Sequence, residues 1–269
     1  AFDSFKIQEV LRGIKMVNTA IVGCNGKMGC FVAQAVQSRE DCNVLFGVDA
    51  FGESNYDFDV FKTFDEATET PDVIIDFSNP AALDGMLAYA VNNKVPCVIC
   101  TTGFSKDQIA KIEDAAKTIP VFYSGNMSLG INLLIELSKE AAKILGNQFD
   151  IEIVEKHHNL KLDAPSGTAL MIADGISEQL DEDPQYVYDR HSYRRKRSKN
   201  EIGIHSVRGG TIVGEHEVIF AGHDEVVTIS HQAQSKEVFA VGAVNAAVFL
   251  KDQKAGMYNM GNLLSEKMN

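Results

Sequence analysis

The sequence predicts an α/β protein in which a doubly wound parallel sheet is joined to a second, α+β domain with a mixed or antiparallel sheet. Three observations support this prediction. Between residues 17 and 103, short apolar runs alternate with helical patterns. After about residue 127 this alternation gives way to closely spaced strands. The length of 269 residues is sufficient for two domains.

The first half of the chain has the strand and helix alternation of βαβ units. It contains the strand VNTAIVG, the helix KMGCFVAQAVQS, the strands NVLFGVD and DVIIDFS, a helix over residues 81–93 and the strand VPCVICTTG. Right-handed crossovers between parallel strands bring their carboxyl ends to one edge of the sheet. We therefore expect a ligand of this domain to bind at that edge.

The second half contains a long helix INLLIELSKEAAKIL, the strand FDIEIVEKHH and the helix TALMIADGISEQL. The strands GEHEVIF and EVVTISH are joined by a short turn at residues 222–224, which indicates a hairpin and hence a mixed or antiparallel sheet. A last apolar helix, FAVGAVNAAVFLKDQ, is expected to return to the first domain. The predicted domains are residues 15–127 with 238–269, and residues 128–237.

The charge of the chain argues against polyanionic partners. The formal net charge is −12 and the pI is about 5.0, so nucleic acid or an anionic membrane would be repelled overall. The basic run at residues 194–197 is interpreted as a solvated loop. No run of about 18 apolar residues is present and the start lacks a signal-peptide core, so we expect a cytoplasmic protein. Residues 1–15 are either a native extension or an expression remnant.

The five cysteines do not have the pattern of a disulfide framework, which fits a reducing compartment. Cys97 and Cys100 make a C-x-x-C pair within the apolar run VPCVICTTG. Residues three apart on a regular strand point to opposite faces, so this pair cannot readily share a metal or a disulfide. We interpret both as small core residues.

A nucleotide site is predicted where the first strand meets the first helix. Gly23, Gly26 and Gly29 lie at this junction, spaced G-x-x-G-x-x-G rather than G-x-G-x-x-G. Glycines there let the backbone turn tightly and approach a pyrophosphate, which binds at the positive end of the helix. The order of strand, glycine loop, helix and second strand is that of a Rossmann-type dinucleotide-binding domain.

Asp49 ends the second strand, 20 residues after Gly29, where an acidic group is expected to bind the adenosine ribose hydroxyls. The alternative is an aspartate in a solvated turn. Ala50 and Phe51 follow it, instead of an arginine that could hold a 2′-phosphate. We therefore expect NADH as the preferred cofactor with NADPH possible, and Lys27 as the residue that could weaken this preference.

The segment EKHHNLKLDAPSGTAL concentrates two histidines, two lysines and an aspartate. His157 and His158 end a strand, so their side chains should point to opposite faces and they are poor partners as metal ligands. Each histidine alone could be an ordinary core or surface residue. With Lys161 close by, we favour a general acid beside a cation, and we expect no metal.

The same segment also predicts an anion site. Asp163 and Pro165 mark the start of a helix, because aspartate caps free amides and proline suits a first turn. The amides of Gly167 and Thr168 are then free to face an anion at the positive end of the helix. Together with Lys161 they could receive the carboxylate of a small acidic substrate.

The runs GCNGKMG, EKHHNLKLDAPSGTA and IHSVRGGTIVGEH resemble the 4-hydroxy-tetrahydrodipicolinate reductase family of bacterial lysine and diaminopimelate biosynthesis. The resemblance extends from about Val17 to the C-terminus. It implies NAD(P)H-dependent reduction of 4-hydroxy-tetrahydrodipicolinate to tetrahydrodipicolinate with loss of water. It also implies a homotetramer built through the sheets of the second domain.

The resemblance further implies individual roles. His157 would be the acid, His158 a substrate contact, and Lys161 both a substrate ligand and a participant in proton donation, while the amides of Gly167 and Thr168 would hold a substrate carboxylate. The implied cofactor contacts are Gly23, Cys24, Asn25, Gly26, Lys27, Met28, Asp49, Cys100, Thr101, Thr102, Ser124, Gly125, Asn126 and Met127.

Two departures from the family pattern affect the site. Cys100 replaces the first glycine of a G-T-T-G loop, which works against a close backbone contact to the nicotinamide. Lys236 stands where some members have a substrate-binding arginine, so the charge is kept but the bidentate fork is lost.

Other interpretations of the sequence are a different two-domain dehydrogenase for a small acid or sugar, or an inactive NADH-binding sensor. The first would leave the EKHH segment without a role. The second would predict binding without turnover. The remaining histidines on the predicted strands lack ligand spacing and are assigned no metal: His205, His216, His223 and His231.

Overall fold

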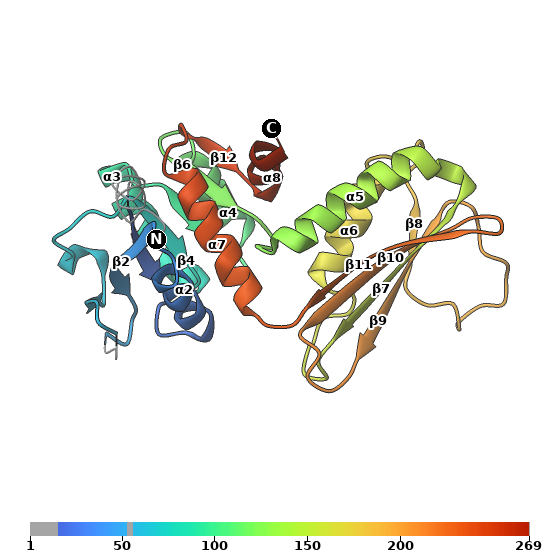
Figure 1. Cartoon of the computed structure of the whole chain (residues 1–269), viewed down its shortest axis with the longest axis horizontal. Helices are drawn as coiled ribbons and strands as arrows, with labels where there is room; N and C mark the ends of the chain where they lie inside the picture. The colour runs from blue at the N-terminus through green and yellow to red at the C-terminus, as the bar shows by residue number, and fades with distance from the viewer. Residues whose placement is uncertain (1–15, 53–55, 269) are drawn as a thin grey trace, which may run out of the picture. The chain divides into compact units, whose positions relative to one another are not determined.

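The computed structural model describes residues 16–52 and 56–268, so the predicted extension at residues 1–15 lies outside the described residues. The chain divides into two compact units, one of Ala1–Met127 with Phe239–Asn269 and one of Ser128–Val238 (Figure 1). The predicted fold class, a parallel sheet domain followed by a mixed sheet domain, is confirmed.

The first unit is built on a seven-stranded sheet in which every pairing is parallel. The strand order is β12-β6-β5-β4-β1-β2-β3. Strands β2 and β3 are added on one side of β1 and the later strands on the other, as in doubly wound nucleotide-binding sheets. The strands are β1 (Val17–Val22), β2 (Cys42–Val48), β3 (Val60–Phe61), β4 (Val73–Asp76), β5 (Cys97–Ile99), β6 (Pro120–Tyr123) and β12 (Gly256–Tyr258).

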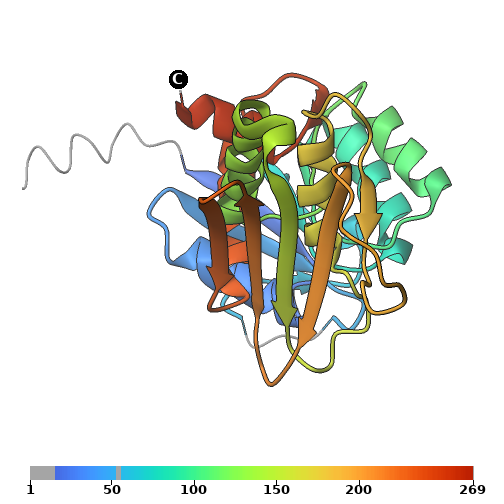
Figure 2. The ribbon, with the colours of Figure 1, turned by 90° about the vertical axis from the view of Figure 1, so that its right-hand side faces the viewer.

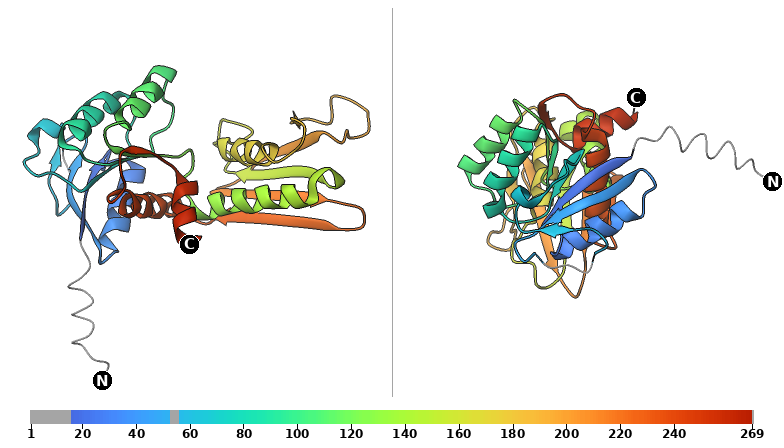
Figure 3. Two further views of the ribbon diagram at one scale, coloured as in Figure 1. Left: turned by 90° about the horizontal axis from the view of Figure 1, so that it is seen from above. Right: turned by 90° about the vertical axis from the view of Figure 1, so that its left-hand side faces the viewer.

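Helices cover both faces of this sheet (Figure 3, right). Helices α2 (Lys27–Gln37) and α7 (Glu237–Leu250) lie on one face, where Arg39 after α2 donates a hydrogen bond of 2.9 Å to Asn245 of α7. Helices α3 (Leu83–Asn93) and α4 (Lys106–Ala115) lie on the other. Short 3₁₀ turns η1 (Phe64–Glu66) and η2 (Pro80–Ala82) and helix α8 (Met260–Met268) complete the unit.

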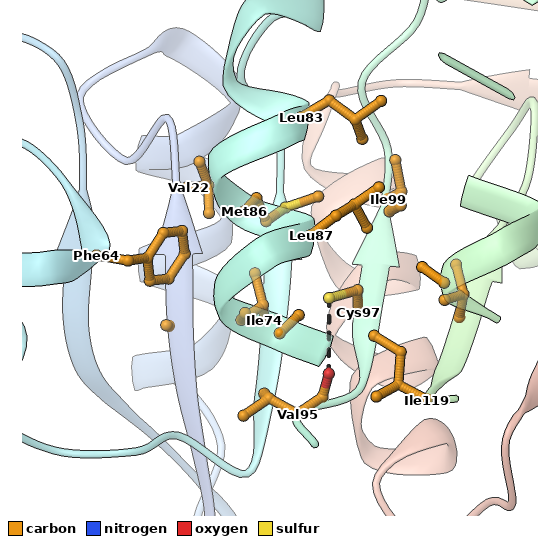
Figure 4. Close-up of a cluster of buried hydrophobic side chains, with 14 of the residues drawn as sticks. Val22, Phe64, Ile74, Leu83, Met86, Leu87, Val95, Cys97, Ile99 and Ile119 are labelled. Carbon is orange, nitrogen blue, oxygen red and sulfur yellow. Dashed lines mark hydrogen bonds between the residues drawn. The ribbon is translucent and has the colours of Figure 1, made fainter. Parts of the chain in front are cut away.

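The core of the first unit lies between this sheet and α3 (Figure 4). Side chains of β1, β4 and β5 meet those of α3, among them Ile74, Met86 and Ile99, which are almost fully buried. Cys97 is also fully buried and its thiol donates to the carbonyl of Val95 at 3.7 Å, so its interpretation as a core residue is confirmed. Cys100 is half-buried just after β5, and all five cysteines are free.

The second unit is built on a mixed five-stranded sheet of order β11-β10-β7-β9-β8. The predicted hairpin of β10 and β11 is confirmed, β10 also pairs antiparallel with β7, and β9 is parallel to β7 and β8. The strands are β7 (Asp150–His157), β8 (Gln185–Val187), β9 (Glu201–Arg208), β10 (Gly214–Ala221) and β11 (Val226–Ala233). His223 lies in the β10–β11 turn, which the sequence predicted at residues 222–224.

Helices α5 (Leu129–Leu145) and α6 (Gly167–Ser177) cover one face of this sheet, and the 3₁₀ turn η3 (Gly146–Gln148) follows α5 (Figure 2). Burial alternates strictly from residue to residue along β7. The side chains that point into the helix-covered core are those of Ile151, Ile153, Glu155 and His157. This alternation puts a carboxylate and an imidazole side by side in an apolar layer, which requires polar compensation.

The basic run differs in part from the predicted solvated loop. Arg194, Arg195 and Lys196 are exposed, as expected. Arg197 is half-buried instead, and its guanidinium pairs with Asp150 and Glu152, both at 3.0 Å. The run therefore ties the segment before β9 to the start of β7.

Two helical glycines allow a matched test of packing. A Cβ atom on Gly242 of α7 would lie 1.7 Å from the carbonyl oxygen of Met127, whereas one on Gly85 of α3 would meet nothing within 4 Å. We expect Gly242→Ala to lower the free energy of unfolding by about 1–3 kcal/mol. Gly85→Ala should raise it by roughly 0.5–1 kcal/mol because alanine is the better helix former. Urea unfolding followed by circular dichroism checks both, and equal effects would contradict the packing argument.

Candidate active site

The glycine loop after β1 is shaped by close backbone contacts. Gly23 has φ +77°, and a side chain there would lie 2.7 Å from the carbonyl oxygen of Phe77 after β4. A Cβ atom on Gly29 would lie 2.1 Å from the carbonyl oxygen of Gly23, so only glycine lets α2 pack this close to the loop. Gly26 is the N-cap of α2 and has no side chain to cover the helix end, which leaves room for an anion.

A cavity of about 490 Å³ lies at the carboxyl edge of the seven-stranded sheet. It is lined by the glycine loop, by the residues that end and follow β2, and by the loop after β4; its lining includes Gly23, Asn25, Gly26, Asp49, Ala50, Phe51, Lys62, Ser78 and Asn79. A glycine cradle at a helix start beside an acidic side chain has the geometry and chemistry that a nicotinamide dinucleotide requires. The residues present therefore fit this cofactor.

Asp49 connects the parts of this cavity. Its carboxylate accepts hydrogen bonds from the amides of Asn25 and Phe51, both at 3.1 Å. Lys27, which we expected to affect the cofactor preference, is exposed at the start of α2 and is not among the described residues that line the cavity. Lys62 lines it instead, and its side chain lies over Gly52. Sequence spacing could not reveal Lys62, because it reaches the cavity from the segment that follows β3.

The remaining predicted cofactor residues lie at the same sheet edge. Cys100, Thr101 and Thr102 follow β5, and residues 124–127 follow β6. The amide of Ser78 after β4 donates to Thr101 Oγ1 at 2.9 Å, which joins two of these loops. Cys24 is fully buried with its thiol against Gly47, and it is not among the described residues that line the cavity.

In the second unit, the structure brings His157 together with a residue that the sequence analysis left without a role. Glu155 is completely buried, and its carboxylate lies 2.6 Å from His157 Nδ1. Arg208 of β9 binds the same carboxylate through two nitrogen atoms at 2.7 and 2.8 Å. Burial opposes ionisation of Glu155, but its bonds to Arg208, Ser206 and His157 prevail and lower its pKa to about 2.

The spacing of two residues on a strand could have indicated that Glu155 and His157 share a face. No spacing in the sequence indicates that Arg208 meets Glu155, because its place depends on the register between β7 and β9, where it pairs with His157. Burial lowers the pKa of His157 below its ordinary value, and the neighbouring Glu155 offsets only part of that effect. The imidazole is therefore neutral at pH 7 in the protein without substrate.

A second buried histidine lies beside the first. His216 of β10 is 4% exposed, and its ring centre is 5.3 Å from that of His157. Its Nε2 atom is 3.1 Å from Ser166 Oγ, while its Nδ1 atom has no hydrogen-bond partner among the residues that the structure describes. Burial lowers the pKa of His216 to about 4.

The start of α6 differs from the prediction. Ser166, not Asp163, is the N-cap, and its hydroxyl accepts from the amide of Ala169 at 3.1 Å. A capping side chain must directly precede the first helical residue, and Asp163 lies too far upstream. Its carboxylate pairs with Lys161 at 2.9 Å instead, and Pro165 precedes the cap rather than occupying the first turn.

Gly167 and Thr168 are the first two residues of α6, as the anion-site prediction requires. His158 is half-buried after the end of β7, and Lys161 lies in the loop between β7 and α6. Lys236 is exposed in the turn before α7. The second unit thus joins an imidazole and a helix N-terminus on one buried carboxylate, and Lys161 lies close enough to His157 to lower its pKa. Together these groups can bind an acidic ligand and exchange a proton with it.

Two family models match the chain: the N-terminus of dihydrodipicolinate reductase over residues 17–127, and its C-terminus over residues 130–264. The chain belongs to the dihydrodipicolinate reductase family. Two relatives named 4-hydroxy-tetrahydrodipicolinate reductase are similar over almost their full length. The one from Caldanaerobacter subterraneus subsp. tengcongensis is 54% identical over 93% of this chain and 99% of its own. The one from Clostridium tetani is 48% identical over 93% and 98%.

A solved structure agrees with this assignment. The dipicolinate-bound dihydrodipicolinate reductase from Paenisporosarcina sp. TG-14 superimposes with a TM-score of 0.76 and 26% identity, covering 92% of this chain and 99% of that one. As a dihydrodipicolinate reductase, the chain is an oxidoreductase of lysine and diaminopimelate biosynthesis with 4-hydroxy-tetrahydrodipicolinate reductase activity, and its family uses NAD(P)H. The alternatives of another dehydrogenase or an inactive sensor are therefore wrong. No helix in the described part of the chain could cross a membrane.

The buried His216 predicts a dependence of stability on pH. Its pKa is about 4 when folded and about 6.5 when unfolded, so the unfolded chain binds more protons between these values. This contribution is complete above pH 6.5 and is lost as the pH falls toward 4, on the order of 3 kcal/mol. His216→Gln keeps a donor near Ser166 but does not titrate, so its unfolding free energy should fall less over this range. Identical losses in both proteins, measured by urea unfolding at several pH values, would contradict this.

Proposed function

We propose that the second unit binds the substrate 4-hydroxy-tetrahydrodipicolinate, a small dicarboxylate, and supplies the proton of its reduction. The observation that carries this proposal is the joining of His157 and the start of α6 through the buried Glu155, with Lys161 close enough to His157 to lower its pKa. Support also comes from the Paenisporosarcina relative, which is described as binding dipicolinate, a dicarboxylate.

The residues would act as follows. Lys161 and the amides of Gly167 and Thr168 would hold one carboxylate of the substrate, and His158 would be a further contact. When bound, the nicotinamide cofactor would supply the hydride to the unsaturated ring that remains once the ring hydroxyl has left as water. His157, assisted by Lys161, would donate the proton that completes the addition and gives tetrahydrodipicolinate.

We further propose that the first unit binds the cofactor through its glycine loop, Asp49 and the loops after β5 and β6, with NADH preferred. Asp49 can accept hydrogen bonds from ribose hydroxyls but repels a 2′-phosphate. Lys62 in the same cavity is a positive charge that allows some use of NADPH. The half-buried Cys100 thiol stays protonated, because burial and the nearby Asp76 raise its pKa.

A homotetramer is proposed through the face of the five-stranded sheet that α5 and α6 leave uncovered. By strand register, this face carries four apolar side chains, those of Val154, Ile219, Val207 and Val226. Val207 is 44% exposed and Val226 is 62% exposed. Apolar side chains on an uncovered sheet face favour association. The five free cysteines support the proposed cytoplasmic location.

Kinetics of two variants test the proton chemistry. With substrate made in place from pyruvate and aspartate semialdehyde by the preceding synthase, loss of NADH absorbance should require every component. We expect His157→Gln to lower kcat by about 10²–10⁴-fold with little change in KM, because only the transition state needs the proton. Lys161→Ala should lower kcat and raise KM. An unchanged kcat in the His157 variant would remove this residue from the mechanism.

The cofactor preference has its own test. The specificity constant should be higher for NADH than for NADPH, and Asp49→Asn should reduce this ratio because it removes the charge that repels the 2′-phosphate. Lys62→Gln should raise the ratio by weakening NADPH alone. A much higher specificity constant for NADPH in the unmodified protein would overturn the proposed preference.

A further inference from the structure

We propose that Glu155 is the positioning residue of this active site: it holds His157 with Nε2 as the proton-exchanging atom and anchors the start of α6 on the same carboxylate. This inference rests on the acid role proposed for His157. Both tasks follow from the contacts of one side chain.

The carboxylate of Glu155 is fully used. Oε2 accepts from Arg208 at 2.8 Å and lies 2.6 Å from His157 Nδ1, while Oε1 accepts from Arg208 at 2.7 Å and from the Ser166 amide at 3.2 Å. The side chain has no exposed surface, so water does not compete for these bonds. β9, the end of β7 and the start of α6 therefore meet on one pair of oxygen atoms.

The charge of Glu155 decides which nitrogen of His157 carries the proton. Arg208, Ser206 and His157 keep the pKa of Glu155 near 2 despite burial, so the carboxylate only accepts hydrogen bonds at neutral pH. Nδ1 of His157 must then be the donor in this bond. Nε2 is left as the atom that takes up a proton and passes it on. Gly214 lies beside it, since a Cβ atom on Gly214 would be 3.2 Å from Nε2.

The second task concerns the anion site. The Ser166 amide donates to Glu155, and the Ser166 hydroxyl accepts from Ala169 and contacts His216. The start of α6, where Gly167 and Thr168 would hold the substrate carboxylate, is thus fixed relative to His157. The acid and the anion site share one anchor, so they cannot shift independently.

The other charged or titratable groups around His157 come from four neighbouring segments. Burial lowers its pKa, as do the charges of Lys161 and Arg208, whereas Glu155 raises it. His216 packs against its ring and His231 of β11 faces His216, but both are kept neutral by burial. Removing the charge of Glu155 therefore makes the imidazolium harder to form.

Strand β7 provides a matched control. Glu152 is bonded to a histidine, His205 at 2.7 Å, and to arginines, Arg190 at 2.9 Å and Arg197 at 3.0 Å, but on the other face of the sheet. Glu152→Gln removes a comparable network without touching His157. A merely structural role for Glu155 predicts similar behaviour of the two variants.

The test compares Glu155→Gln with Glu152→Gln. We expect Glu155→Gln to lower kcat at least tenfold and to move the fall of kcat at rising pH to lower pH, because the acid form of His157 is lost earlier. Glu152→Gln should keep the unmodified pH profile. Nuclear magnetic resonance of histidine-labelled protein, with His157 assigned through His157→Gln, should show the Nδ1–H tautomer in the unmodified protein and its partial loss in Glu155→Gln only. An unchanged tautomer of His157 in Glu155→Gln would overturn the proposal.

A double variant controls for the destabilisation that Glu155→Gln alone could cause. Glu155→Gln leaves the buried side of Arg208 without a counter-charge, which destabilises the protein, whereas removing both charges is better tolerated. Glu155→Gln/Arg208→Met should recover cooperative thermal unfolding but not the tautomer or the pH profile. If it restores both, Glu155 acts only by neutralising Arg208, and the proposal fails.

The resonance measurement needs no substrate, so the two hypotheses can fail separately. Loss of the Nδ1–H tautomer in Glu155→Gln supports the positioning role even if His157→Gln leaves kcat intact, in which case the acid role of His157 is what fails. A large effect of His157→Gln on kcat with an unchanged tautomer in Glu155→Gln supports the acid role of His157 and overturns the positioning role of Glu155.

Discussion

The second unit depends on the compensation of one buried charge. A carboxylate without solvent exposure is unstable unless its oxygen atoms are hydrogen-bonded and its charge is paired. Glu155 meets this condition because its carboxylate is hydrogen-bonded to Arg208, the Ser166 amide and His157. These partners belong to separate segments of the chain, so satisfying the charge also sets the register of β7 with β9 and the place where α6 begins. A requirement of folding and the arrangement of the active site thus have the same physical origin.

In the first unit, the shape of the site depends on the close approach of backbone segments instead of on a buried charge. Gly23 and Gly29 remove the side chains that would collide with the loop after β4 and with the loop itself. Because parallel strands end at one edge, the loops after β1, β2, β4 and β5 converge there without any long-range sequence signal. The two units therefore build their sites in different ways, one by omitting side chains and one by neutralising a buried side chain.

Parts of both sites could be predicted from local sequence. The glycine spacing, Asp49 at the end of a strand, and the histidines before a helix start are all recognised within about 30 residues, the span of a βαβ unit. The N-cap predicted at Asp163 is Ser166 instead, since a short loop can hold more than one candidate cap and the chain path selects among them. Lys62 could not be predicted because it reaches the nucleotide cavity from the segment after another strand, β3.

The sequence by itself determined the fold class, the family, the glycine loop and the segment that carries the chemistry, because periodicity and short motifs depend on neighbours along the chain. Only the tertiary structure decided that Arg208 meets Glu155, that His216 packs against His157, and that Arg197 reaches back to β7. Those contacts join residues about 40 to 60 positions apart, and they exist only once strand register and the covering helices have brought the segments together.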